Sequence, residues 1–192
     1  MTLHSEFILY ACPVGPLAQQ IERYFEKSRD RCGPNAAHAY MPHCTLTGFF
    51  RDEMSAIATY TQALNAIFST PSPPLFTEAI HLKPLAFSHR WHGIPIASDQ
   101  LIQIATAFVA AACSPTRTES IRLKLDLHLS LAYQFDPACE RVLKQLATSL
   151  IDPSAPVGWE LRFYERCTES GRTSNRRWRC HFRRTLQAVR EQ

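Results

Sequence analysis

One short pattern, a histidine followed two residues later by a hydroxyl residue, occurs twice in this chain. The first copy is His43 with Thr45, and the second is His128 with Ser130. Each copy lies in a run typical of a β-strand, in which alternate side chains point to the same face. Each strand is therefore expected to present an imidazole and a hydroxyl together. If the two strands are neighbours in a sheet, all four groups can contact one phosphate.

The residues around each copy predict which side chains enter the core. In the first copy, Thr47 shares the face of His43, and Cys44 turns to the opposite face as a small buried hydrophobe. In the second copy, alternate residues form a polar face: Lys124, Asp126, His128 and Ser130. The intervening residues form an apolar face that is expected to enter a core: Leu123, Leu125, Leu127, Leu129, Leu131 and Tyr133. Tyr133 is thus predicted to point away from His128.

The pairing of imidazoles with hydroxyls suits the transfer of a phosphoryl group between two oxygens. One proton must leave the attacking oxygen and another must reach the leaving oxygen, and histidine can perform both tasks near neutral pH. The hydroxyls can donate hydrogen bonds to the non-bridging oxygens and stabilise the charge that grows in the transition state. This chemistry requires no metal in principle, so we predict neither a metal site nor a cofactor.

The two motif segments resemble the paired signatures of the two-histidine (2H) phosphoesterase superfamily. The resemblance rests on residues 43–50 (HCTLTGFF) and 128–133 (HLSLAY). Residues 131–135 and 159–166 are in addition similar to the phosphoesterase domain of the TULA-type (ubiquitin-associated and SH3-containing) proteins. The resemblance extends over nearly the whole chain.

This resemblance implies an α+β fold with two lobes. Each lobe would be an antiparallel sheet with helices on the outside, and the lobes would be related by a pseudo-twofold axis around a central cleft. Residues 1–192 would form a single two-lobed domain, a size that can bury a substantial core. The resemblance also implies that His43 is the general acid and His128 the general base, while Thr45 and Ser130 hold the phosphate.

Four further residues are weaker candidates for contact with the substrate: Tyr10, Thr47, Lys124 and Tyr164. Tyrosines can stack on unpaired bases, although core packing is the alternative for both. Thr47 has no counterpart in the second motif, where Ala132 stands, so a structural role is the alternative there. A fifth residue, His92, lies either in the cleft or on the surface.

The order of strand and helix patterns supports a duplicated plan. Strands are predicted at 6–12, 43–50, 75–85, 91–97 and 121–135, helices at 16–31, 52–68, 98–113 and 137–150, and a hairpin at 159–167 with 178–184. Asp52 and Ser98 are predicted to cap the helices that they begin.

The charge distribution leaves the size of the substrate open. A net charge of +4 suits an anionic substrate but falls short of a dedicated nucleic-acid surface. Arginines gather near the C-terminus, where they form either a basic rim near the substrate or an exposed solubilising turn: Arg162, Arg166, Arg172, Arg176, Arg177, Arg179, Arg183, Arg184 and Arg190. A closed cleft would favour mononucleotides, and an open basic groove would favour oligonucleotides.

Cysteine usage and hydropathy predict a cytoplasmic protein. The seven cysteines show no Cys-x-x-Cys spacing, which argues against a zinc site and against a disulfide scaffold. No segment approaches the roughly 18 uninterrupted apolar residues of a membrane span. We therefore expect no membrane association, and nothing indicates an obligate protein partner.

Three classes of function remain open. The first is a metal-independent phosphodiesterase that hydrolyses 2′,3′-cyclic phosphates of nucleotides or RNA ends. The second keeps the site but acts on 2′-5′-linked oligonucleotides, or on RNA as a 3′-5′ exonuclease. The third is a non-catalytic module that binds RNA or nucleotides. The two complete motifs argue against the third class, because binding alone needs no imidazole pair.

Overall fold

The structure is a computed structural model that describes residues 4–69, 79–168 and 176–186. The described strands are β1 (His4–Val14), β2 (Cys44–Thr45), β3 (Phe50–Glu53), β4 (His81–Leu82), β5 (Ala86–Ser88), β6 (Trp91–Ala97), β7 (His128–Tyr133), β8 (Gly158–Thr168) and β9 (Arg176–Leu186). The α-helices are α1 (Pro16–Cys32), α2 (Ile57–Ser69), α3 (Asp99–Ala111) and α4 (Glu140–Leu150). No helix in these ranges is long and apolar enough to cross a membrane.

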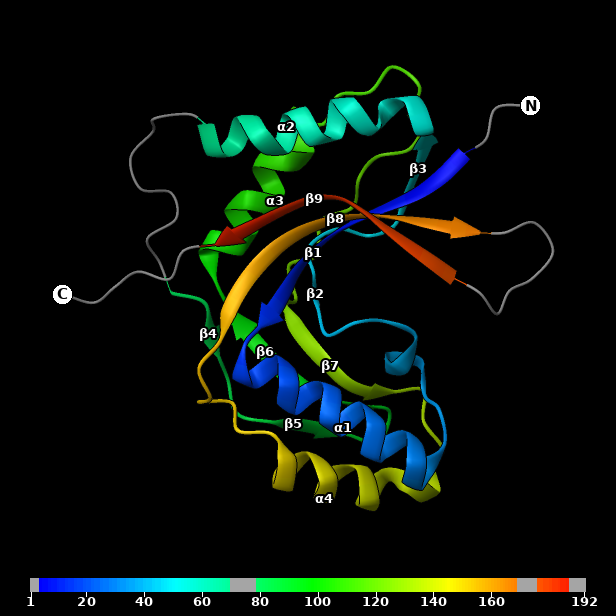
Figure 1. The fold of residues 1–192 in the computed structure, drawn as a ribbon, viewed down its shortest axis with the longest axis vertical. Coiled ribbons are helices and arrows are strands. Elements are labelled where there is room, and N and C mark those ends of the chain that lie inside the picture. The colour runs from blue at the N-terminus through cyan, green and yellow to red at the C-terminus, as the bar shows by residue number, and fades with distance from the viewer. Residues whose placement is uncertain (1–3, 70–78, 169–175, 187–192) are drawn as a thin grey trace.

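The strands form an antiparallel sheet in the order β4-β6-β7-β2-β1-β8-β9, with β3 on β1 and β5 on β6. Figure 1 shows α2 and α3 at one end of the molecule and α1 and α4 at the other, with the strands between them. This arrangement confirms the predicted α+β class. The two expected half-sheets are joined edge to edge, because β2 and β7 pair at Cys44 and Leu129. The two motif strands are therefore neighbours.

Local signals in the sequence explain where the helices begin and end. Pro16 opens α1, and Gly33, with a φ of 74°, follows its last turn. The Ser98 side chain accepts a hydrogen bond from the Leu101 backbone N–H, which confirms it as the cap of α3. The helices bury apolar stripes against the sheet, among them Leu17 and Ile21 of α1.

The first motif strand is shorter than predicted. Within 43–50 only Cys44–Thr45 is strand, and β3 begins at Phe50. The residues between them bulge away from β1, because the backbone N–H groups of Leu46 and Thr47 both donate to the Leu9 carbonyl. The predicted cap at Asp52 is also wrong, since Asp52 lies within β3 and α2 begins only at Ile57.

Asp52 has a structural role in place of capping. Its buried carboxylate accepts hydrogen bonds from the hydroxyls of Tyr60 and Thr116, at 2.5 and 2.6 Å. The bond from Thr116 ties β3 to the segment that follows α3.

The second motif strand is also shorter than predicted. Of residues 121–135, the structure makes only His128–Tyr133 a strand. In the preceding segment, the Lys124 backbone N–H donates to the Leu46 carbonyl, and the Arg122 carbonyl accepts from the Gly48 N–H. Without a regular ladder the predicted alternation fails, and Leu125 is 66% exposed although it was assigned to the apolar face.

A β-bulge in β7 overturns the prediction for Tyr133. On β6, Gly93 pairs with Ser130 and its neighbour His92 pairs with Ala132, so Leu131 is an extra residue in β7. Leu131 and Ala132 are both buried, and Tyr133 returns to the face of Ser130. One inserted residue thus moves Tyr133 to the side predicted for the phosphate.

The remaining strand predictions have mixed outcomes. The strand at 91–97 and the C-terminal hairpin are confirmed as β6 and as β8 with β9. The strand predicted at 75–85 falls partly outside the described residues, and its described part contains only β4. The short strand β5 was not predicted.

Candidate active site

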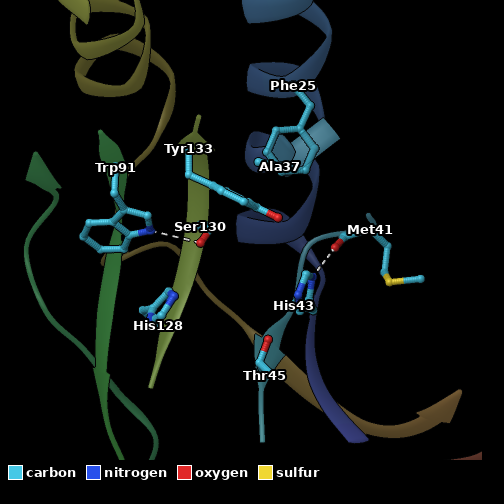
Figure 2. A pocket seen from close by; sticks show the side chains of 9 residues that line it. All are labelled: Phe25, Ala37, Met41, His43, Thr45, Trp91, His128, Ser130 and Tyr133. Carbon is cyan, nitrogen blue, oxygen red and sulfur yellow. Dashed lines mark hydrogen bonds between the residues drawn. The ribbon is translucent and has the colours of Figure 1, made fainter. Parts of the chain in front are cut away.

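A cavity of about 220 Å³ lies where β2 meets β7, beneath the C-terminal half of α1. Its lining residues are Phe25, Ala37, Met41, His43, Thr45, Trp91, His128, Ser130 and Tyr133. The structure therefore brings together both predicted histidines and both predicted phosphate-binding hydroxyls. Figure 2 shows His43 and Thr45 on one side of this cavity and His128 and Ser130 on the other.

Both imidazoles are oriented by the same backbone contact. The Nδ1 of His43 lies 2.7 Å from the carbonyl oxygen of Met41, and the Nδ1 of His128 lies 2.9 Å from that of Asp126. A carbonyl can only accept, so each Nδ1 carries a proton and donates it to the residue two places earlier. The Nε2 atom of each neutral ring is thereby left to accept or, once protonated, to donate a proton.

His43 occupies the more aromatic of the two environments. Its ring packs against Tyr10, at 4.1 Å between ring centroids, and against Tyr40, at 5.4 Å. Burial lowers the pKa of His43 to about 4; the hydrogen bond to Met41 opposes this shift, and the charge of His128 adds to it. His43 is therefore neutral at pH 7 when no anion occupies the cavity.

The hydroxyls come from the paired motif strands. Thr45 lies opposite Tyr10 in the ladder between β2 and β1. Ser130 accepts a hydrogen bond of 3.0 Å from the indole Nε1–H of Trp91 on β6. The Trp91 ring also meets the His128 ring edge to face, with 5.2 Å between centroids. Trp91 thus contacts both functional groups of the second motif.

The sequence did not single out four of the lining residues, Phe25, Ala37, Met41 and Trp91, and it predicted the wrong face for a fifth, Tyr133. Phe25 belongs to the apolar stripe of α1, a pattern that also fits plain core packing. Ala37 lies in a short 3-10 helix, Ala36–Ala39, and Met41 lies between this helix and β2; both segments are too short for a periodic pattern. The bulge in β7, which the sequence does not show, places Tyr133 on the cavity side.

None of the four weaker candidates lines the cavity. Tyr10 is buried behind His43, and Tyr164 is buried with its hydroxyl 3.4 Å from the Nη1 of Arg162. Thr47 is buried, and its hydroxyl accepts a hydrogen bond from the Leu9 N–H at 3.1 Å. Lys124 is half-buried in the irregular segment before β7.

His92 lies neither in the cleft nor on the surface. It is fully buried on the other face of β6, with its ring 5.0 Å from that of Phe87 and 4.8 Å from that of Phe135. Within the described part of the chain, neither ring nitrogen has a hydrogen-bond partner. Burial accordingly lowers the pKa of His92.

Among the described residues, the lining of the cavity contains neither lysine nor arginine. Several of the C-terminal arginines pair with carboxylates of the sheet: Arg162 and Arg183 with Glu160, Arg166 with Glu6, and Arg179 with Glu165. The side chains of Arg172, Arg176, Arg177 and Arg190 lie outside the described residues. In the described ranges no group of three or more His, Cys, Asp or Glu side chains could hold a metal ion.

Comparisons with known proteins agree with this geometry, although no family model matches the chain. The chain is 36% identical over 195 residues to the ecdysteroid-phosphate phosphatase of Drosophila melanogaster, covering 84% of this chain and 26% of that protein. It is 32% identical over 175 residues to the human ubiquitin-associated and SH3 domain-containing protein B, covering 85% and 25%. The chain thus spans about a quarter of the length of these relatives.

The structure is similar to that of Escherichia coli LigT complexed with 3′-AMP, with a TM-score of 0.56 and 14% identity over 96% of this chain and 99% of that one. This likeness shows the fold, in which the two motif strands are neighbours. The relatives that are 32% identical over 85% of the chain show its family: the chain belongs to the TULA type, the group of the ubiquitin-associated and SH3 domain-containing proteins.

Proposed function

We propose that this chain is a metal-independent phosphodiesterase that hydrolyses 2′,3′-cyclic phosphates of nucleotides or RNA ends. One observation carries the proposal. Two imidazoles, each fixed with its proton on Nδ1, share one small cavity with two hydroxyls. This arrangement offers two proton-transfer groups and two hydrogen-bond donors to a single phosphate.

The proposed reaction divides the proton transfers between the two rings. Nε2 of His128 removes a proton from water as the water oxygen forms a bond to phosphorus. The bond from phosphorus to the ribose 3′ oxygen breaks, and Nε2–H of His43 protonates that oxygen. Thr45 and Ser130 donate hydrogen bonds to the non-bridging oxygens. The product is the 2′-phosphate, and the proton gained by His128 returns to solvent.

The lowered pKa of His43 adds a requirement to this scheme. A general acid must be protonated, yet burial keeps His43 neutral at pH 7 in the empty cavity. An anionic phosphate placed beside the ring favours its charged form. We therefore expect the pKa of His43 to rise as the substrate binds, so that the ring takes up the proton that it later gives to the leaving oxygen.

The cavity favours a small substrate. Its volume of about 220 Å³ lies below the ~300–1,000 Å³ of typical drug-sized sites. Phe25, Trp91 and Tyr133 supply apolar and aromatic walls for a sugar or base, and no lysine or arginine of the described residues is part of the lining, where it could follow a nucleic-acid backbone. A nucleotide is also the ligand of the LigT complex with 3′-AMP. These features support a mononucleotide or a terminal nucleotide over a long oligonucleotide.

The test is hydrolysis of the four 2′,3′-cyclic mononucleotides in EDTA, with identification of the product phosphate. His43→Ala and His128→Ala should each abolish turnover, whereas His81→Ala, which alters an exposed histidine outside the cavity, should not. Failure of the folded protein to cleave any of the four would remove this proposal. The 2′-5′ oligonucleotides, RNA 3′ ends and a binding-only role would then be examined in that order.

A further inference from the structure

Trp91 holds the hydroxyl of Ser130 from behind. Its Nε1–H donates to the serine oxygen at 3.0 Å, and Figure 2 shows this bond reaching across from β6 to β7. A hydroxyl has one hydrogen to donate and two lone pairs to accept with. Because the indole occupies one lone pair and has nothing to accept with, the serine hydrogen is directed elsewhere, and Ser130 lines the cavity.

The backbone of β6 is shaped to receive this indole. A Cβ atom at Gly93 would lie 2.3 Å from Cζ2 of Trp91 and 2.3 Å from the carbonyl oxygen of Leu129. Both distances are far too short for a real side chain. Only glycine therefore lets the Trp91 ring lie across the strand while β7 passes close by.

The same ring also borders the second catalytic candidate. The indole meets His128 edge to face at 5.2 Å, and the Nδ1–H of His128 is held on the opposite side by Asp126. The His128 imidazole is thus restrained between a backbone carbonyl and the Trp91 ring. In the described part of the chain, no tryptophan indole donates a hydrogen bond to Thr45, the hydroxyl of the first motif.

We propose that Trp91 is a positioning residue, which acts through Ser130 by fixing its hydroxyl as a donor to the substrate phosphate. Gly93 makes this possible by leaving room for the ring. The inference deepens the function proposed above and rests on it for the identity of the anion. On this proposal, Trp91 acts through the hydrogen bond from its indole N–H, and not through the volume of its ring.

The test is a double-mutant cycle that joins Trp91→Phe with Ser130→Ala. Phenylalanine keeps an aromatic ring but removes the indole N–H. In the native background, Trp91→Phe should lower kcat/KM and weaken inhibition by inorganic phosphate by roughly three- to tenfold, the worth of one neutral hydrogen bond. In the Ser130→Ala background, the same change should have almost no effect. Trp159→Phe, which alters a buried tryptophan of β8 outside the cavity lining, is the matched control and should leave kcat/KM per folded molecule unchanged.

Two results would overturn the inference. Equal losses from Trp91→Phe in both backgrounds would mean that the tryptophan acts by packing or by its own contact with substrate. No loss in either background would mean that the hydrogen bond is irrelevant to binding.

A second measurement does not depend on activity or on altering Trp91. The indole ¹H–¹⁵N resonance of Trp91 should shift in Ser130→Ala, and inorganic phosphate should shift it in the native protein but not in that variant. If cyclic nucleotides are not hydrolysed while these shifts occur, the proposed function fails and the positioning role stands. If neither Ser130→Ala nor inorganic phosphate changes the chemical shift of this resonance, the positioning role is refuted.

Discussion

On the β2 side of the cavity, His43 packs at a tilt against the rings of Tyr10 and Tyr40, and its neighbour Thr45 belongs to a strand of two residues. On the β7 side, His128 meets the edge of Trp91, and Ser130 belongs to a strand of six. The two sides share one local contact, the hydrogen bond from the histidine Nδ1–H to the carbonyl two residues earlier. The two histidines differ in the aromatic rings that they contact.

This difference separates two properties of a catalytic histidine. The backbone contact sets the tautomer, and it is equal on both sides. The packing sets the charge, and on the His43 side it lowers the pKa to about 4. Two copies of one motif can therefore present the same ring nitrogen, Nε2, to one cavity in different surroundings, and these surroundings lower the pKa of His43.

The largest expected difference between the two sides should appear with a substrate whose leaving group needs no general acid. His43→Gln and His128→Gln should each lower kcat on a 2′,3′-cyclic nucleotide by about 10²–10⁴-fold. On a p-nitrophenyl phosphodiester, whose leaving group departs without a proton, His43→Gln should lose far less than His128→Gln. Steady-state kinetics on both substrates checks this prediction, and the opposite order of losses would exchange the two roles.

The β7 side depends on Gly93 in a way that the β2 side does not. Gly93→Ala places a Cβ atom 2.3 Å from a backbone oxygen and from the Trp91 ring. The expected loss in the free energy of unfolding is about 3 kcal/mol, the upper range of typical overpacking. Gly48→Ala beside β2 is the matched control, since its nearest neighbour is the flexible Arg122 side chain at 3.2 Å. Urea unfolding should show less than about 1 kcal/mol for that change.

Acid should destabilise the protein through three buried or half-buried histidines, of which only His43 lines the cavity. Burial lowers the pKa of His38 and His43 to about 4 and also lowers that of His92. The unfolded chain, with ordinary values near ~6.5, binds more protons, so stability is complete above that pH and is lost as the pH falls toward 4. Urea midpoints at several pH values test this. The slope should flatten in His38→Gln, and an unchanged slope would contradict the argument for His38.

The smallest effect links the two sides directly. The charge of His128 is the weakest of the three influences on the pKa of His43, and it acts downward. His128→Gln should therefore raise the pKa of His43 while leaving it below the ordinary value of about 6.5, because burial remains. An NMR titration of the His43 ring measures this. A pKa unchanged by the substitution would show that the charge of His128 does not affect the pKa of His43.

Much of the site could be predicted from the sequence because the pairing of each histidine with a hydroxyl depends on residues only two places apart. Alternation along a strand places a histidine and the second residue after it on one face, and this holds for 43–45 and for 128–130. The cap at Ser98 and the C-terminal hairpin were predictable for the same reason, since each depends on a few adjacent residues.

What sequence could not predict depends on partners far along the chain. The exposure of Leu125 follows from the backbone bonds that residues 122–124 make with residues 46–48. The role of Asp52 follows from Tyr60 and Thr116, which reach its carboxylate only in the folded structure. Trp91 reaches Ser130 only because β6 lies beside β7 in the folded sheet. Periodicity contains none of this information.

The extra residue at Leu131 has a consequence for how related chains should be aligned. It lies between Ser130 and Tyr133, which both line the cavity, so a length change of one residue there would exchange the side chain that faces the cavity. His128, which precedes Ser130 on β7, and His43, which directly precedes β2, would be untouched. Substrate preference in such proteins can therefore diverge through a single insertion or deletion, and a gap placed one position wrong would conceal it.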